Sequence, residues 1–274
     1  MTFVGTDVTY AAGPPEPDEE RPSRGLRQIL REPAKVWSYI GIPLLVAASW
    51  IALYVWVDGL ELDRIEAPIL TWGNIQARTI EHIELSLIAT VFIVAIAVPL
   101  GMVLTRPFAK PVTPLFIGLA NIGQAIPSIG VIFFLALPFL LGIGARTAIV
   151  AVILYCILPV LRNTMVGIDQ VDPALIESAR GMGMSKAAVL FRIELPLAVP
   201  VVLAGVRTAL ILAVGTMTLA TFINAGGLGD IINQGIVQNR DSILITGAVL
   251  TAGLALLIDW LAGIAEEVLR PKGL

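Results

Sequence analysis

The sequence is poor in the residues on which many enzyme active sites depend. Among its 274 residues there is a single cysteine, Cys156, and a single histidine, His82. One cysteine cannot form a disulfide within the chain or a thiolate-rich metal site. One histidine excludes a metal site built from several histidines. We therefore expect no catalytic centre and no metal site in this chain.

Charged residues are also scarce. They make up 14% of the chain, whereas hydrophobic residues make up 57%, and soluble proteins have about 25% charged residues. The net charge of −3 is too small to suggest a nucleic-acid partner. The composition indicates an integral membrane protein.

A nucleotide-binding motif is absent as well. The sequence contains no G-x-x-x-x-G-K-[ST], the pattern whose backbone amides and lysine bind nucleotide phosphates. The glycine-rich stretch "AGGLG" at 225–229 lacks the lysine, and we interpret it as a turn. We expect no cofactor in this chain.

Long apolar segments are abundant, and a membrane-spanning helix needs about 20 such residues. Helices are predicted because backbone polar groups in lipid must be satisfied within the segment. The third segment is interrupted by Pro127 and Pro138, and the fourth is short, with an extension to 168 left open. The predicted fold is all-α with about six transmembrane helices, at 37–57, 83–104, 112–141, 148–161, 198–222 and 243–265.

The distribution of Lys and Arg predicts the orientation. Thirteen lie before the first span, in the loops after the second and fourth spans, or after the sixth, against four in the opposite loops. Arg162 is counted in the loop after the fourth span. Positive residues favour the cytoplasmic side, so both termini are predicted to be cytoplasmic. We interpret the acids of the first outer loop, among them Asp63, Glu66 and Glu81, as solvated.

The basic loop after the fourth span has the signals of a helical hairpin. Asp172 and Pro173 are typical of a helix start, and Gly181 or Gly183 can end that helix. Ser185 can cap a second short helix, which Pro196 is expected to stop before the next span. A solvated loop remains an alternative. The apolar residues at this water interface instead favour a docking surface; they are Met182, Met184, Val189, Leu190 and Phe191.

This loop resembles the coupling loop of binding-protein-dependent, type I ATP-binding cassette (ABC) importer permeases. Their pattern is Glu-Ala-Ala, three residues, Gly, nine residues, Ile-x-Leu-Pro. The residues here that match that spacing are Glu177, Ser178, Ala179, Gly183, Ile193, Leu195 and Pro196, with Ser178 replacing the first alanine. In that family the loop docks on a cytoplasmic ATPase subunit.

Further stretches narrow the resemblance to permeases for glycine betaine, carnitine and choline. They are "VPLGMVLTR", "QAIPSIGVI", "LYCILPVLRNTMVGID" and "GVRTALILAVGTMTLATFINAGGLGDIINQGI". The resemblance covers 81–267 and implies a permease domain there, with its coupling loop at 169–196. Before it, the polar, proline-rich composition predicts a disordered cytoplasmic tail at 1–36, and hydropathy predicts the first transmembrane helix at 37–57. A permease for another small solute, such as an amino acid, is the nearest alternative.

The same resemblance implies that this chain lies in the cell membrane and acts with several partner proteins. They are two cytoplasmic ATPase subunits that bind ATP, a second permease chain, identical or paralogous, and an extracytoplasmic solute-binding protein. Trp72 stands alone in the outer loops, so no aromatic cage for a quaternary ammonium is expected here. An ion-coupled secondary transporter and a membrane enzyme are weaker alternatives.

Polar residues within the spans are candidates for a translocation path, because such residues are costly in lipid. Hydrogen bonding between helices is the alternative interpretation. The candidates are Asn121, Gln124, Pro127, Ser128, Thr216, Thr218 and Thr221. Arg207 and Asp259 lie at similar predicted depths, roughly 13 and 10 Å from the cytoplasmic ends of their spans. We expect them to form a buried ion pair.

Overall fold

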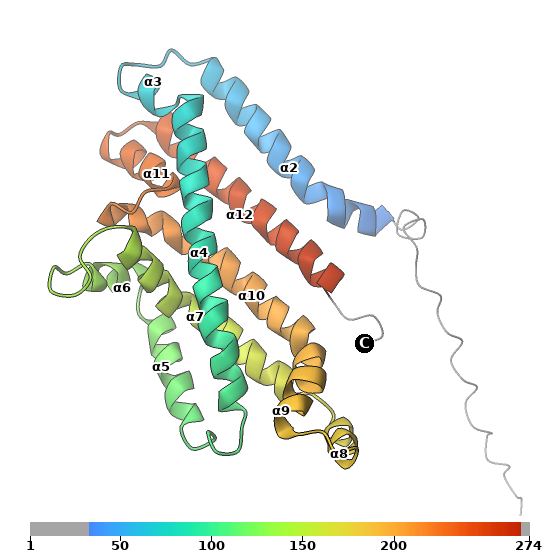
Figure 1. The fold of residues 1–274 in the computed structure, drawn as a ribbon. Coiled ribbons are helices and arrows are strands. Elements are labelled where there is room, and N and C mark those ends of the chain that lie inside the picture. Colours follow the sequence, from blue (N-terminus) through green and yellow to red (C-terminus); the bar gives the residue numbers. More distant parts are fainter. Residues whose placement is uncertain (1–32, 270–274) are drawn as a thin grey trace, which may run out of the picture.

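The computed structural model describes residues 33–269, and it is helical throughout that range apart from turns and loops (Figure 1). Most of the predicted tail at 1–36 lies outside the described residues. The elements are α2 (Pro33–Asp58), α3 (Glu66–Ile69), α4 (Trp72–Leu104), α5 (Thr113–Ala125), α6 (Ser128–Leu135), α7 (Ala145–Asp169), α8 (Pro173–Gly181), α9 (Lys186–Val189), the π-turn η1 (Leu190–Glu194), α10 (Leu195–Met217), the 3-10 turn η2 (Thr218–Ile223), α11 (Leu228–Val237) and α12 (Asp241–Leu269).

Five helices of the described chain are long and apolar enough to span a membrane. They are α2, α4, α7, α12 and the continuous run from α9 to η2. The remaining predicted span, the third at 112–141, contains α5 and α6 and is not a continuous helix. These two helices meet at 98°, because Ile126 and Pro127 are extended. A residue that precedes proline is disfavoured in the α conformation, so the chain bends there.

Two further boundaries differ from the sequence expectation. α4 begins at Trp72, eleven residues before the predicted start of the second span, and Thr71 caps it by accepting a 3.4 Å hydrogen bond from the Asn74 amide. The stretch 72–82 is too polar to be recognised by hydropathy, yet it is helical. Beyond η2, Asn224 and two glycines have positive φ, as expected for a turn at "AGGLG", and α11 follows as an unpredicted short helix.

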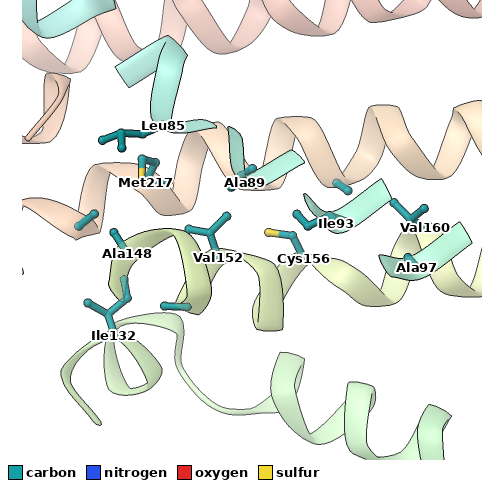
Figure 2. Close-up of a cluster of buried hydrophobic side chains, with 14 of the residues drawn as sticks. Leu85, Ala89, Ile93, Ala97, Ile132, Ala148, Val152, Cys156, Val160 and Met217 are labelled. Carbon is teal, nitrogen blue, oxygen red and sulfur yellow. The ribbon is translucent and has the colours of Figure 1, made fainter. Parts of the chain in front are cut away.

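The core lies where α4, α7 and α10 pack together (Figure 2). Many of the residues buried there are alanines, including Ala89, Ala97, Ala151, Ala209 and Ala213. Cys156 lies among them and is fully buried. Membrane helices associate largely through close packing at small residues, since lipid offers no hydrophobic advantage to contact between helices. The alanines therefore set the short spacing of these three helices.

Glycines bring α7 and α10 even closer at two points. A Cβ added at Gly205 of α10 would lie 2.7 Å from Asn163 Cβ and 2.8 Å from the Pro159 carbonyl oxygen of α7. A Cβ added at Gly167 of α7 would lie 3.1 Å from the Ala198 Cβ and carbonyl oxygen. The helices can therefore keep this spacing only with glycine at 205, whereas a side chain at 167 would require a small shift of its neighbours.

The substitution Gly205→Ala is expected to lower the free energy of unfolding by about 1–3 kcal/mol, because the added methyl overpacks the contact with α7. Gly215→Ala is the matched control on the same helix, since no atom lies within 4 Å of its added Cβ. Thermal unfolding in detergent measures both. Equal stability of the two variants would contradict the close contact between α7 and α10.

Candidate functional site

The basic hairpin between α7 and α10 has the predicted caps. The Asp172 carboxylate accepts a 2.8 Å hydrogen bond from the Ala174 amide at the start of α8. The Ser185 hydroxyl accepts one of 3.2 Å from the Ala188 amide at the start of α9. Both side chains satisfy amides that lack partners in the first turn of a helix. The sequence thus encodes two separately capped helices.

The turn between α8 and α9 is closed by a Schellman motif. The Met184 amide donates to the Ala179 carbonyl at 3.1 Å, and the Gly183 amide donates to the Arg180 carbonyl at 2.9 Å. Gly183 has a φ of +88°, which is a left-handed conformation. Glycine adopts it without steric cost. Of the two glycines considered from the sequence, Gly183 is therefore the one that forms the turn.

The expectation that Pro196 stops the second helix is wrong. The chain continues from α9 through η1 into α10, and the Leu195 amide bonds to the Leu190 carbonyl, as in a π-turn. Proline removes the amide that would bond to the carbonyl four residues earlier and crowds that carbonyl. The wider turn at 190–194 accommodates Pro196 within a continuous helix. The hairpin is therefore joined rigidly to the longest membrane-spanning run.

The apolar surface of the hairpin is smaller than predicted. Met182 is 77% exposed and Phe191 is 58% exposed, but Val189 is buried, so it is not part of the surface. Arg180, Lys186 and Arg192 are exposed. Two large apolar side chains among exposed positive charges form a surface suited to contact with another protein.

An ion pair at the base of the hairpin was missed from the sequence. Arg106, just after α4, lies with its Nη2 2.5 Å and its Nη1 3.3 Å from the two carboxylate oxygens of Glu194 in η1. Glu194 is only 4% exposed. A two-point guanidinium–carboxylate contact fixes orientation as well as distance. In the sequence, the one sign of this ion pair was the acid Glu194 inside the otherwise apolar stretch "IELP".

The residues predicted to line a path lie in two groups, one at the α5–α6 bend and one from the end of α10 into η2. Asn121 is exposed on α5, and Gln124 and Ser128 are partly exposed on either side of the bend at Pro127. Thr216 is buried in α10. Thr218 donates to the Gly215 carbonyl at 2.7 Å, and Thr221 donates to Asp230 of α11 at 2.6 Å. Thr218 and Thr221 thus have structural partners and Thr216 is buried, whereas the α5–α6 group remains accessible.

Arg207 and Asp259 do meet, with Nε 2.6 Å from Oδ1. Their side chains are 36% and 25% exposed, so the pair is half-buried rather than buried as expected. Glu266 lies 3.5 Å from the same guanidinium. Gly263 lets the guanidinium approach α12, since an added Cβ there would lie 3.1 Å from its Nη1. The contact joins α10 to α12.

Acids that were interpreted as solvated form contacts at the opposite end of the bundle. Glu81 accepts a 2.8 Å hydrogen bond from the Gly227 amide. Its carboxylate also lies 2.9 Å from the guanidinium of Arg78. Arg78 also lies 3.0 Å from Asp230. This network links α4 to α11 and to the glycine turn that precedes it.

The loop before α3 is held by two more of these acids. The Glu66 amide and the Arg240 guanidinium both lower the pKa of Asp63, and the amide has the larger effect. The pKa of Glu66 is lowered by the Asp63 amide and then by the Ser242 hydroxyl, which donates to it at 2.5 Å. The loop is thereby attached to the start of α12.

Trp72 does not stand alone, contrary to the sequence expectation. It lines a groove together with Trp50 and Tyr54 of α2, next to Asp58. Residues of α12, including Thr246 and Leu250, complete the groove. Hydropathy assigned Trp50 and Tyr54 to an interfacial belt, so their proximity to Trp72 could not be predicted before the helices were placed.

The double variant with Arg207→Ala and Asp259→Ala is expected to lose less unfolding free energy than the sum of the losses in the two single variants. Arg207→Ala leaves Asp259 without its partner, and Asp259→Ala leaves Arg207 with only the longer Glu266 contact, so the coupling free energy should be about 0.5–3 kcal/mol. Thermal unfolding of the four proteins in detergent gives the value. Arg146→Ala combined with Asp259→Ala should be additive, and an additive Arg207/Asp259 cycle would contradict a stabilising pair.

Residues 97–270 match the family described as binding-protein-dependent transport system inner membrane component. The chain is 46% identical to the choline transport system permease protein OpuBB of Bacillus subtilis over 74% of this chain and 91% of that protein. It is 37% identical to the osmoprotectant import permease protein OsmW of Salmonella typhimurium over 78% of this chain and 100% of that protein.

Solved structures agree on the fold. A chain of the MetNI methionine ABC transporter, in an inward-facing conformation, superposes with a TM-score of 0.65 at 24% identity, over 77% of this chain and all of that chain. A chain of an amino acid ABC transporter with histidines gives 0.62 at 16% identity, over 76% and 100%. At these identities the likeness concerns the fold alone.

Proposed function

This chain belongs to the family of binding-protein-dependent transport inner membrane components, and from that premise we propose that it is the permease subunit of an ATP-driven importer of quaternary-ammonium osmoprotectants. The proposal is carried by the 46% identity to a choline permease. A 43% identical relative of Bacillus subtilis is a glycine betaine/carnitine/choline permease and is likewise matched over 74% of this chain. The chain itself is a multi-pass membrane component and not an enzyme.

The hairpin at 169–196 is the proposed docking site for the ATPase. Its support is the capped geometry, the exposed Met182 and Phe191, and the surrounding positive charges. Because α9, η1 and α10 form one continuous helix, a force applied to the hairpin acts directly on a membrane span. The Arg106–Glu194 contact would carry the same movement to α4.

The proposed assembly contains two ATPase subunits, a second permease chain, identical or paralogous, and an extracytoplasmic binding protein. ATP binding draws the ATPases together and turns the pathway between the permeases outward. The loaded binding protein then releases its solute into the pathway, and hydrolysis resets the complex. In this scheme the accessible residues Asn121, Gln124 and Ser128 line the pathway, since their positions on α5 and α6 are not covered within the described chain.

Two alternative functions are an ATP-driven importer for another solute and an ion-coupled transporter. An importer for an amino acid would use the same hairpin and differ only in solute, and the amino acid transporters of the same fold keep this candidate open. An ion-coupled transporter typically has carboxylates near the middle of the membrane. Asp259 is already paired with Arg207, which disfavours that alternative.

The function is tested in sealed vesicles that contain the complete transporter and the saturated binding protein. Uptake of glycine betaine or choline should require ATP and should continue when an ionophore has removed all ion gradients. Uptake that stops with the ionophore and ignores ATP would contradict the proposal. Uptake of methionine or histidine alone would replace the solute class but keep the ATP-driven mechanism.

The substitution Gly183→Val is expected to abolish ATP-driven uptake, because a β-branched residue is strongly disfavoured at a φ of +88° and the docking turn should be lost. Membrane insertion and the amount of protein should not change, since the turn lies outside the spans. Gly181→Val is the matched control. Its added Cβ also meets no atom within 4 Å, and Gly181 has no positive φ.

Uptake and ATP hydrolysis are measured together for both variants. Loss of uptake in Gly183→Val, with retention in Gly181→Val, is the predicted result. Transport at the unmodified rate in Gly183→Val would contradict the coupling role of the hairpin.

A further inference from the structure

Arg162 lies within a membrane span, because the fourth span extends to 168 and beyond, as the sequence allowed, and the placement of Arg162 in the loop is wrong. It belongs to α7, which continues to Asp169. Its neighbour Asn163 packs at Gly205 of α10, eleven residues beyond Glu194. Arg162 itself lies seven residues before the end of α7 at Asp169, which is a rise of roughly 10 Å. The Arg162 backbone is therefore inside the membrane-spanning part of α7, on the hairpin side of its middle.

The guanidinium of Arg162 has no carboxylate partner in the described part of the chain. The guanidinium groups of Arg106 and Arg207, by contrast, each have an acid within 4.0 Å. Arg162 instead donates through Nη2 to the neutral Asn121 Oδ1 of α5 at 2.8 Å. An amide oxygen orients the guanidinium but leaves its charge uncompensated.

The surface around Arg162 is also uncovered. Both Arg162 and Asn121 are exposed, and α5 contains no buried residue at all. In Figure 1, α5 lies at the edge of the bundle, beside α7 and away from α12. Charged groups within a membrane-spanning segment face water or a compensating partner, because exposure to lipid is costly. This edge must therefore face an aqueous path or another chain.

We propose that Arg162, held by Asn121, is the site in the translocation path that binds the carboxylate of a zwitterionic osmoprotectant. The inference rests on the proposed function and makes it more specific. Glycine betaine carries a carboxylate in addition to its quaternary ammonium, whereas choline carries a neutral hydroxyl at the corresponding end. An uncompensated guanidinium attracts the first group and repels a solute with net positive charge. The chain thus favours zwitterions over cations.

The test compares transport of the two solutes by the complete transporter in proteoliposomes, with the binding protein saturated by each solute in turn. Saturation removes the selectivity of the binding protein from the comparison. The variant is Arg162→Gln, which keeps a hydrogen-bond donor but removes the charge. Arg146→Gln is the matched control, since it removes an exposed arginine from the first turn of the same helix.

Arg162→Gln should lower glycine betaine uptake about ten- to one-hundred-fold, which is the range expected for a lost charged hydrogen bond. Choline uptake should be unchanged or faster. Arg162→Lys should recover part of the betaine rate, and Arg146→Gln should leave the ratio of the two rates as it is in the unmodified protein.

Equal loss of both solutes in Arg162→Gln would overturn the proposal, because it would mean that the guanidinium pairs with an acid of a second chain and acts in assembly. An unchanged ratio at an unchanged rate would overturn it too. If the unmodified transporter carries neither solute, the proposed function is wrong, and the inference falls with it. Purification of the variant with its partners separates loss of assembly from loss of selectivity.

Discussion

The close approach of α7 to α4 and α10 is the constraint on which the rest of the structure depends. The contact consists of alanines and glycines, so the helix backbones approach one another closely, and Gly205 leaves no room for even one added methyl. Packing of this kind has few alternative arrangements. It fixes the depth of Arg162 on α7, and it places the start of α10 beside the end of α4, where Arg106 meets Glu194. Hairpin and core are therefore parts of one rigid unit.

Charge is distributed around that unit in three ways. At the end opposite the hairpin, Arg78, Glu81 and Asp230 hold the glycine turn to α4. On the hairpin side, acids of α12 neutralise Arg207. Within α7, the guanidinium of Arg162 has no acid beside it in the described chain and donates to the Asn121 amide oxygen instead. The first two groups join helices to one another, whereas the third points to something outside the chain, either a solute or a second subunit.

Much of this architecture was accessible from the sequence, because hydropathy locates long spans and capping residues locate helix ends. The caps at Asp172 and Ser185 and the approach of Arg207 to Asp259 follow from such local signals.

Three features of the structure could not be predicted from local signals. The bend at Pro127 and the continuation through Pro196 depend on whether the chain around each proline can relax, and the two prolines have opposite outcomes. The position of Arg162 was obscured by its charge, since hydropathy ended the fourth span just before it. The groove formed by Trp50, Tyr54 and Trp72 exists only once α2 lies against α4 and α12.

In the proposed mechanism a separate ATPase docks on the hairpin and moves this chain. The sharpest test is purification of the tagged chain from its native membrane, with identification of the proteins that accompany it. We expect an ATP-binding cassette subunit together with an extracytoplasmic solute-binding protein. Recovery of the chain alone, fully active in uptake driven by an ion gradient, would contradict it.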